Sequence, residues 1–435
     1  MRTIKTFSVP DDKEEFKLQL LHWGRPFEEM IYMDSNTSNH LYHDYDAMLA
    51  IEAFTALKTD DIDAFQKLED YQVTTNDWLF GYLSYDLKNA TESISSKNED
   101  HLNFPELYFI QPKKIWLMKG DQIQAHYLKM VDDEIESDFQ SIITTKHTKP
   151  HYNLKKFSPQ WEKETYLERA SHILRHIQRG DIYEVNFCQE FHLKDSKIDP
   201  YSTFEHLNST SKAPFSSFLK LENYHALCAS PERFLKKQGD KLISQPIKGT
   251  SKRGQSHDED ERLKLALSRD PKEISENVMI VDLVRNDLSK TALKSSVTVE
   301  ELCKVYTYEQ VHQMISTVTS TVKANLSVSE IIKSLFPMGS MTGAPKLSAM
   351  EISETYESTK RGLYSGCIGY ITPDHNFDFN VVIRTLLYNS DNHYLSYMVG
   401  SALTSQADPE QEYEECLVKA KALQYVVNAT GVTED

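Results

Sequence analysis

The sequence predicts a protein of the α+β class, with antiparallel strands packed against helices. A helix is indicated after Trp161, where apolar residues recur at helical spacing. A strand is indicated at residues 183–187, where apolar and polar side chains alternate. Residues 108–110 and 115–118 are short apolar runs separated by Pro112 and two lysines, which is the pattern of a hairpin.

The composition is that of a soluble chain with an acidic surface. Its 435 residues are 40% hydrophobic, which is enough for a large core, and the length allows two or three domains. The formal charge of −17 argues against binding to nucleic acid or to a membrane surface. No run is long and apolar enough to span a bilayer.

Cysteine usage and the first residues both favour a cytoplasmic location. The five cysteines are dispersed and show neither metal nor redox spacing, which is typical of reduced thiols in the cytosol. Residues 1–6 run into charged side chains without the apolar core of a signal peptide. We therefore expect a cytoplasmic protein.

The first 150 residues give the weaker patterns. Residues 78–86 predict a buried strand with a tyrosine-rich edge. Residues 144–150 are polar and end in proline, which makes them the best candidate for a linker. We therefore divide the chain into an N-terminal part, residues 1–150, and a second part, residues 151–435.

The pattern sharpens after Trp161. Gly180 is the expected end of the helix, and basic residues precede it. In the strand that follows, Glu184 and Asn186 alternate with the apolar residues, which predicts one wet face. The apolar stripe of the helix consists of Tyr166, Ala170, Ile173, Leu174 and Ile177.

Two polar residues stand close to predicted strand ends or turns. Residues 224–229 predict a strand, and Glu232 lies just beyond it, within reach of a cleft; an exposed turn glutamate is the commoner case. Lys248 lies between Pro246 and Gly249 in a segment too turn-rich for a helix. A lysine amine becomes a nucleophile or base when its pKa is lowered, although most such lysines are simply solvated.

Two helices are predicted to begin with the same acidic design. Asp270 caps a helix with Pro271 at its first position, and Asp408 with Pro409 repeats the arrangement. Acids favour helix starts through the dipole alone. Two such helices facing each other would instead form an all-oxygen site suited to Mg²⁺. The paired carboxylates are Glu273 with Glu276 and Glu412 with Glu415, and the apolar stripe of the first helix is Ile274, Val278 and Val281.

Two further segments are candidates for binding an anion. The glycines of residues 336–346 predict a loop, with Pro345 starting a helix; its backbone amides are candidates for holding an anion, and a structural turn is equally compatible. Residues 378–385 predict a strand that carries Arg384 inward. A buried arginine needs an anionic partner, internal or bound.

Taken together, these motifs resemble the chorismate-utilising enzymes. The resemblance is strong from about residue 155 to 425 and weaker around residues 81–86. Within that family, a lysine in the segment Pro-Ile-Lys-Gly-Thr points to the aminodeoxychorismate synthases. Anthranilate synthases carry alanine there, and isochorismate and salicylate synthases place a basic lysine at the position of Glu184.

The resemblance implies a fold, a cofactor and roles for the candidate residues. The fold is the anthranilate synthase component I type, an interwoven two-subdomain antiparallel β-sandwich flanked by helices, in which residues 151–435 form the chorismate-binding catalytic domain. Lys248 would attack ring carbon 2 of chorismate and Glu232 would protonate the departing hydroxyl. Mg²⁺ would be held by Glu276 and Glu415, with Glu273 and Glu412 close by, and would favour the neutral amine of Lys248. Substrate would be bound by Arg384, Tyr364, Thr250, Gly249 and Gly400.

Some positions depart from the family pattern. Glutamine usually stands where Glu184 is, arginine where Gln245 is, and an active-site histidine where Gln313 is, with His312 one place early. The Leu-Leu-Glu-Ser motif that binds tryptophan in many relatives is absent from the N-terminal region, so we expect no tryptophan feedback. The lysine and the four glutamates are intact.

The resemblance also implies partners. The substrates would be chorismate and ammonia, and we expect a separate type 1 glutamine amidotransferase subunit to supply the ammonia. The alternatives are anthranilate synthase component I, isochorismate synthase, or a subunit that binds chorismate without chemistry.

Overall fold

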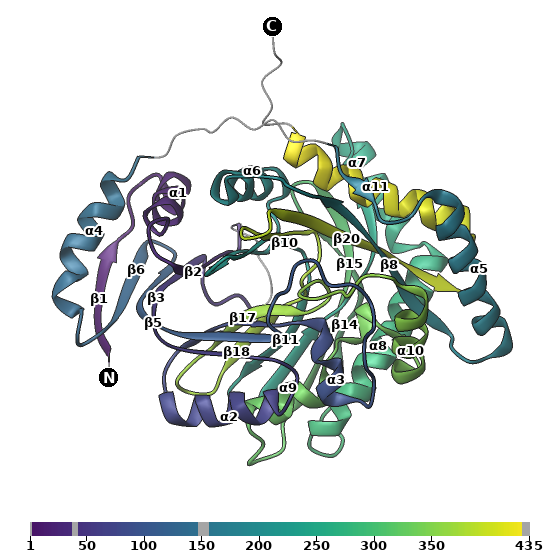
Figure 1. Ribbon diagram of the computed structural model, residues 1–435, viewed down its shortest axis with the longest axis horizontal. Coiled ribbons are helices and arrows are strands. Elements are labelled where there is room, and N and C mark those ends of the chain that lie inside the picture. Colours follow the sequence, from purple (N-terminus) through teal and green to yellow (C-terminus); the bar gives the residue numbers. More distant parts are fainter. Residues whose placement is uncertain (1, 37–41, 147–155, 429–435) are drawn as a thin grey trace, which may run out of the picture.

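The computed structural model describes residues 2–36, 42–146 and 156–428 (Figure 1). The helices are α1 Lys13–Trp23, α2 Ala64–Thr75, α3 Lys88–Thr91, α4 Ile135–Thr144, α5 Lys163–Arg179, α6 Pro200–Ser211, α7 His257–Ser268, α8 Pro271–Thr291, α9 Val328–Leu335, α10 Lys346–Tyr356 and α11 Pro409–Asn428. Short 3₁₀ turns are η1 Tyr85–Leu87, η2 Asp132–Glu134 and η3 Gly339–Met341.

The strands join in one hydrogen-bonded network, and the ladders between them in the described residues are antiparallel. This confirms the predicted α+β class. The strands are β1 Arg2–Ser8, β2 Glu29–Asp34, β3 Ala47–Thr59, β4 Leu79–Leu83, β5 Leu107–Lys119, β6 Gln122–Leu128, β7 Ser158–Pro159, β8 Glu184–Leu193, β9 Phe215–Leu221, β10 Tyr224–Ser230, β11 Arg233–Gln238, β12 Lys241–Gln245, β13 Ile247–Lys252, β14 Thr298–Thr307, β15 Val311–Thr321, β16 Gly343–Ala344, β17 Cys367–Ile371, β18 Phe377–Asn380, β19 Thr385–Asn389 and β20 Tyr394–Thr404.

Strands from the two ends of the chain alternate in space. β2 pairs with its neighbour β3 on one side and with β9 on the other. β4 pairs with β5 on one side and with β17 on the other. The boundary near residue 150 therefore separates segments whose strands share the same ladders; residues 147–150 of the proposed linker lie outside the described residues.

Two apolar cores lie on opposite faces of the strands that run through the middle of Figure 1. Along β3, Met48 and Ala50 face the first core while Leu49 and Ile51 face the second, as the alternation of a strand requires. The first core is closed by α2, α8 and α9, and the second by α1, α5, α6 and α11. The result is a layered body of helices, sheet, sheet and helices.

The predicted hairpin at residues 108–118 is wrong, because β5 runs through it as one strand. Pro112 interrupts the apolar pattern without turning the chain. It lies opposite Ala53, beside a register shift in β3, so its missing N–H is tolerated. Its carbonyl accepts a 2.6 Å hydrogen bond from the guanidinium of Arg2.

Two other predictions about single elements are confirmed. The strand predicted at residues 78–86 is β4, which is fully buried but ends at Leu83, before the turn η1. The helix after Trp161 is α5, and it ends at Gly180, which adopts the left-handed conformation at φ 84°. Most of its predicted apolar stripe is buried, and Leu174 is half-buried.

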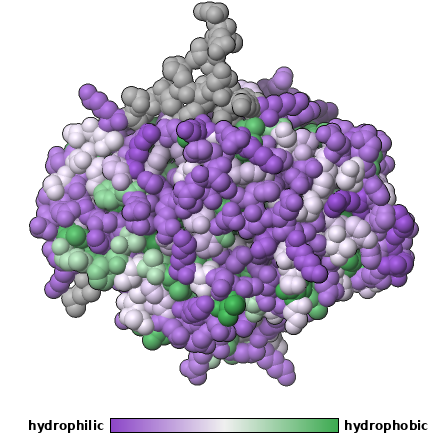
Figure 2. All heavy atoms as spheres, viewed as in Figure 1, coloured by the Kyte–Doolittle hydropathy of each residue, from purple (hydrophilic) through white to green (hydrophobic). Residues whose placement is uncertain are grey.

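The visible surface is dominated by hydrophilic residues, with small separated apolar areas (Figure 2). This agrees with a formal charge of −17. Within the part of the chain that the structure describes, none of the helices combines the length and apolarity needed to cross a membrane.

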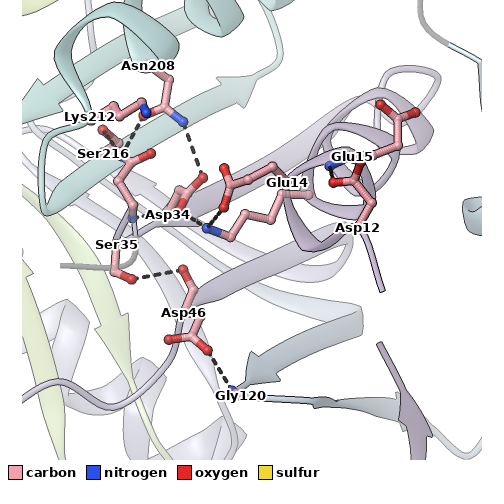
Figure 3. Close-up of polar contacts among 12 residues, drawn as sticks. Asp12, Glu14, Glu15, Asp34, Ser35, Asp46, Gly120, Asn208, Lys212 and Ser216 are labelled. Atoms are coloured by element: carbon pink, nitrogen blue, oxygen red, sulfur yellow. Dashed lines mark hydrogen bonds and ion pairs between the residues drawn. The ribbon is translucent and has the colours of Figure 1, made fainter. Parts of the chain in front are cut away.

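A buried ionic cluster ties the N-terminal strands to α6 (Figure 3). Asp34, at the end of β2, accepts hydrogen bonds from Lys17 at 3.1 Å and from Asn208 of α6 at 3.2 Å. The Tyr32 hydroxyl and the Asn36 amide also donate to Asp34. Lys17 is 2% exposed and pairs with Glu14 as well. Both charges are thus buried with several partners each.

Candidate active site

A cavity of about 550 Å³ opens between β13, β15 and β20 and the first turns of α8 and α11. It brings together residues that lie far apart in the sequence. The predicted site residues that line it are Glu232, Lys248, Gly249, Thr250, Glu273, Glu276, Tyr364, Arg384, Gly400, Glu412 and Glu415.

Lys248 lies on strand β13, not in the turn-rich loop that the sequence indicated. Pro246 separates β12 from β13, and both strands pair with β15. The register with β15 shifts between Ile247 and Thr250, so the strand is irregular at Lys248. This irregularity beside the paired strand positions the lysine at the cavity wall.

The Lys248 amine forms a 2.9 Å ion pair with Glu184. Burial lowers the pKa of Lys248, but the negative charges of Glu184, Glu276 and Glu232 outweigh burial, so its pKa is raised overall. The protein's own groups therefore favour the ammonium form. These carboxylates do not produce the neutral Lys248 amine that the resemblance leads us to expect.

Glu184 is the first residue of β8, and the prediction of a wet face on this strand is wrong. Glu184 is 2% exposed and Asn186 is 9% exposed, because β16 and β20 cover the strand on its two edges and the cavity residues lie over it. The polar residues of β8 instead point into the interior near the cavity. The alternation of polar and apolar residues in β8 therefore reflects a polar face that is buried.

Glu232 lies between β10 and β11 and is buried at the cavity wall. Burial raises its pKa to about 7, although Ser340, Lys248 and Arg384 act in the opposite direction. A carboxyl with such a pKa carries a proton at neutral pH that it can donate. The exposed-turn alternative is therefore wrong for Glu232.

Arg384 does not lie on a continuous strand, because the chain breaks between β18 and β19. Arg384 adopts a positive φ of 51° in this break, and its side chain is exposed to the cavity. Among the described residues its guanidinium forms no ion pair. The arginine is thus available to an anion that enters the cavity.

The other predicted substrate contacts surround Lys248 and Arg384. Tyr364 is buried, and its hydroxyl lies 4.0 Å from the Cys188 thiol. Gly400 packs against Cys188 so closely that an added Cβ would lie 2.7 Å from its sulfur. Gly249 has a φ of 90°, which disfavours any residue with a side chain. Both glycines allow the cavity to approach the backbone.

The starts of both acidic helices are as predicted. Asp270 accepts hydrogen bonds from the amides of Lys272 and Glu273, and Asp408 accepts from Glu410 and Gln411. The predicted apolar stripe of α8 is only partly confirmed: Val281 is buried, Ile274 is half-buried and Val278 is 37% exposed. The buried face also includes Asn277, Ile280 and Val284.

The four predicted metal ligands border the cavity together with two lysines. Lys272 lies 3.9 Å from Glu276 and 3.7 Å from Glu412, so it bridges the two helices. Lys419 pairs with Glu415 at 2.7 Å. The sequence reasoning missed both lysines, although their spacing of four residues from Glu276 and Glu415 was a usable indication.

The acidic helices carry an excess of negative charge toward the cavity. Burial and neighbouring carboxylates raise the pKa values of Glu273, Glu276 and Glu412. Burial also acts on Glu415, but its ion pair with Lys419 lowers its pKa overall.

These carboxylates fit the ligand chemistry of Mg²⁺, which takes a few carboxylate oxygens and completes its shell with water and substrate. Within the described residues, however, no three acidic, histidine or cysteine side chains converge closely enough to form a ready-made metal cluster. Binding of Mg²⁺ here would therefore draw on fewer protein ligands at once or on side-chain rearrangement.

The glycine-containing segment at residues 336–346 contributes a short strand, the start of a helix and part of the cavity wall. Gly343 and Ala344 form β16, which pairs with Val185 and Glu184 of β8. Pro345 caps α10, as predicted. Ser340 and Met341 line the cavity, and Ser340 acts on Glu232; neither was predicted as a site residue.

The positions that depart from the family pattern have different surroundings. Gln245 accepts a hydrogen bond from Arg233 and donates to Thr317, and His312 lies 3.0 Å from Asp260. Gln313 lines the cavity, and in the described structure its buried amide has no hydrogen-bond partner.

The fold is similar to that of a solved enzyme structure. Anthranilate synthase component I from Streptococcus pneumoniae TIGR4 superposes with a TM-score of 0.76 over 89% of this chain and 93% of the other. The two sequences are 21% identical, so the similarity concerns the fold.

The family follows from the sequence comparison. The profile described as "chorismate binding enzyme" matches residues 25–425. The chain therefore belongs to the family of chorismate binding enzymes.

The named relatives include anthranilate synthases as well as aminodeoxychorismate synthases: anthranilate synthase component 1 of Thermus thermophilus is 31% identical over 352 residues, covering 79% of this chain and 76% of the relative. Aminodeoxychorismate synthase component 1 of Bacillus subtilis is 31% identical over 360 residues, covering 79% of this chain and 75% of the relative. The chloroplastic aminodeoxychorismate synthase of Arabidopsis thaliana is 40% identical over 269 residues, covering 61% of this chain. The chain matches only 29% of the length of that plant relative.

Proposed function

We propose that this chain converts chorismate and ammonia to 4-amino-4-deoxychorismate, in the branch that leads to para-aminobenzoate and folate. The observation that carries the proposal is the position of Lys248, whose amine borders the same cavity as Glu232 and Arg384. A lysine at this position is what the resemblance associates with aminodeoxychorismate synthases. The similarity to the Bacillus subtilis protein supports the same assignment.

In the proposed reaction the enzyme residues divide the work. Arg384 binds the enolpyruvyl carboxylate of chorismate by charge-assisted hydrogen bonds, beside Tyr364. Lys248 attacks ring carbon 2, the two ring double bonds shift, and the bond from carbon 4 to its hydroxyl breaks. Glu232 donates its proton to this hydroxyl, because hydroxide is a poor leaving group.

Ammonia then completes the reaction. It adds at carbon 4, the double bonds shift back, and the Lys248 amine leaves carbon 2. The covalent intermediate divides one difficult displacement into two easier ones. The protein emerges unchanged, with carbon 4 carrying an amino group.

Mg²⁺ is part of the proposal as the counterion of the ring carboxylate. Glu276 and Glu415 would hold it, with Glu273 and Glu412 beside them. When bound, it would neutralise the negative charge of a substrate that the acidic cavity otherwise repels.

The partner and location are proposed on the same basis. A type 1 glutamine amidotransferase would supply ammonia, and free ammonium would replace it in the test tube. The five cysteines are free thiols, as suits a reducing cytosol.

The test is an assay of purified protein with chorismate, Mg²⁺ and ammonium, with products identified by mass spectrometry. We expect 4-amino-4-deoxychorismate, and omission of Mg²⁺ or ammonium should abolish it. Anthranilate or isochorismate as the main product would overturn the assignment in favour of those synthases. Binding of chorismate without turnover would make the chain a binding subunit.

A further inference from the structure

The carboxylate of Glu184 and the amine of Lys248 form a direct pair beside the cavity. Their 2.9 Å contact joins β8 to β13, two strands that do not pair with each other. The Glu184 side chain is 3% exposed and that of Lys248 is 14% exposed. The lysine thus reaches the cavity while its partner lies behind it, screened from solvent.

Charged groups on several elements face the Lys248 amine. Glu184 comes from β8, Glu276 from α8, Glu415 from α11, and Glu232 from the connection after β10. Only the Glu184 contact is short enough for an ion pair in the described residues. The combined charge stabilises the ammonium form of Lys248, which has no lone pair with which to attack carbon.

The ammonium must therefore lose a proton before the nitrogen can bond to the ring. Glu232 cannot accept it, because the proposed reaction needs Glu232 to begin protonated and to donate. Glu276 is a proposed metal ligand, and Mg²⁺ would reduce its basicity. Glu184 is already hydrogen-bonded to the proton in question.

We propose that Glu184 is the general base that accepts the proton of Lys248 as the amine attacks ring carbon 2, and that it returns the proton when the amine leaves. This inference rests on the proposed function, since it concerns the same covalent step. It adds a role for a residue at which the chain departs from its family pattern.

The protons and electrons balance over the cycle. One proton passes from Lys248 to Glu184, the nitrogen lone pair forms the bond to carbon 2, and the carbon 4 hydroxyl leaves as water with the proton of Glu232. The adduct is then a secondary ammonium, with Glu184 protonated and Glu232 ionised. Addition of ammonia at carbon 4 expels the Lys248 amine, which takes the proton from Glu184, and the new ammonium returns a proton to Glu232.

The experiment measures the first half-reaction alone. Enzyme, chorismate and Mg²⁺ are mixed without ammonium, and the Lys248 adduct is quantified by mass spectrometry against time between about pH 5 and pH 6, below the pKa of about 7 at which Glu232 loses its proton. The variants are Glu184→Gln, which removes the base with little change in shape, and Glu184→Asp, which retains a carboxylate. Glu300→Gln on β14 is the matched control, since Glu300 also accepts from a lysine, Lys241, at 2.7 Å but lies outside the cavity.

We expect Glu184→Gln to slow adduct formation about 100-fold near pH 6. Its rate should rise about tenfold per pH unit, because the proton must now go to water, while the wild-type rate stays nearly constant over this range. Glu184→Asp should recover a nearly constant rate. Glu300→Gln should behave as wild type.

Glu184→Gln that forms adduct as fast as wild type, or faster, would overturn the proposal, because the carboxylate would then only restrain the ammonium. If Glu184→Gln does not fold, Glu184→Asp decides: a rate that rises tenfold per pH unit in that variant contradicts a base at this position, and a constant rate supports it.

A second measurement separates this inference from the proposed function. Without substrate, Lys248 is labelled with an amine-reactive reagent across a pH series and read by peptide mass spectrometry. Labelling of Lys248 in Glu184→Gln should begin at lower pH than in wild type, because the carboxylate that raises its pKa is gone. No shift would refute the pairing itself. A clear shift in a protein that forms no adduct would leave the pairing intact and fault the proposed function.

Discussion

Two buried lysines, one in the N-terminal half and one in the cavity, show how the same side chain is used for different ends. Lys17 donates to Glu14 and to Asp34, each at 3.1 Å, within the cluster of Figure 3. Asp34 in turn accepts from Tyr32, Asn36 and Asn208. Lys248 has one close partner, Glu184, and the rest of its amine borders the cavity.

The difference lies in the donors that remain unused. An ammonium has three N–H groups, and a lysine with several fixed partners is held in place and costly to disturb. An amine with one fixed partner and an open side can reach a ligand. Both lysines have a raised pKa, so the shift alone does not distinguish the structural residue from the reactive one.

Replacing Lys248 by alanine is the change with the largest expected effect. Formation of 4-amino-4-deoxychorismate should fall by about a thousandfold or more, because the nucleophile is gone. The resemblance to anthranilate synthases, which carry alanine there, predicts a shift of the remaining product toward anthranilate. Lys252→Ala, at an exposed position of the same strand, is the control. An unimpaired Lys248→Ala enzyme would contradict the comparison.

Glu232→Gln tests the acid on the other side of the cavity. We expect kcat to fall by about 100-fold, because the amide cannot donate a proton to the leaving hydroxyl. In wild type, activity should decline as pH rises through about 7, where Glu232 ionises. The pH profile must be measured at constant free ammonia. A profile without this decline would remove Glu232 from the role.

The Glu232 carboxyl should also make the free energy of unfolding depend on pH. Because burial raises its pKa from 4.5 to about 7, the protonated form favours the folded state, and this contribution is lost progressively as pH rises from about 4.5 to about 7. Glu232→Gln should abolish that part of the pH dependence in denaturant unfolding.

Lys17→Met sharpens the comparison from the structural side. Removing one member of a buried ion pair leaves Asp34 without its cation, so the free energy of unfolding should fall by about 3 kcal/mol. Activity per folded molecule should not change. Lys13→Met on the same helix is the control, because its pair with Asp121 is exposed and contributes at most about 1 kcal/mol. Loss of activity in a folded Lys17→Met protein would contradict a purely structural role for Lys17.

Arg384→Gln should have the smallest effect. We expect KM for chorismate to rise about tenfold, with a lesser change in kcat, because a charge-assisted hydrogen bond to the substrate is weakened. Arg262→Gln, at an exposed position of α7, should leave both constants unchanged. The measurement is steady-state kinetics at saturating ammonium. A large fall in kcat with an unchanged KM for chorismate would contradict this role of Arg384.

The sequence predicts which residues form the site better than it predicts the backbone conformation of those residues. Local rules predicted the capped starts of α8 and α11, since Asp-Pro followed by spaced acids is a short-range pattern. Motifs identify Lys248 and Arg384, but local sequence does not predict their backbone: Lys248 lies on a strand and not in a loop, and Arg384 lies in a break between two strands. The neighbouring strand β15 makes Lys248 part of an irregular strand, and the break before β19 places Arg384 at positive φ.

The errors share a cause, which is that pairing partners are distant in sequence. Pro112 suggests a turn because the sequence around it does not show the register shift in β3, which is what allows a proline at this position of β5. The local sequence predicts a solvated Glu184, because the strands β16 and β20 and the residue Lys248 that bury it are far away in the chain. A period-two pattern shows that two faces differ, but it does not show that the polar one faces water.

The pairing of β4 with β17 has a consequence for how the chain is made. A ribosome releases residues 79–83 long before residues 367–371 exist, so an edge of the early sheet waits for more than half the polypeptide to be synthesised. The waiting edge offers unpaired amides and carbonyls to any other nascent strand. Expression yield should therefore depend on holdase chaperones and growth temperature even where the finished protein is stable.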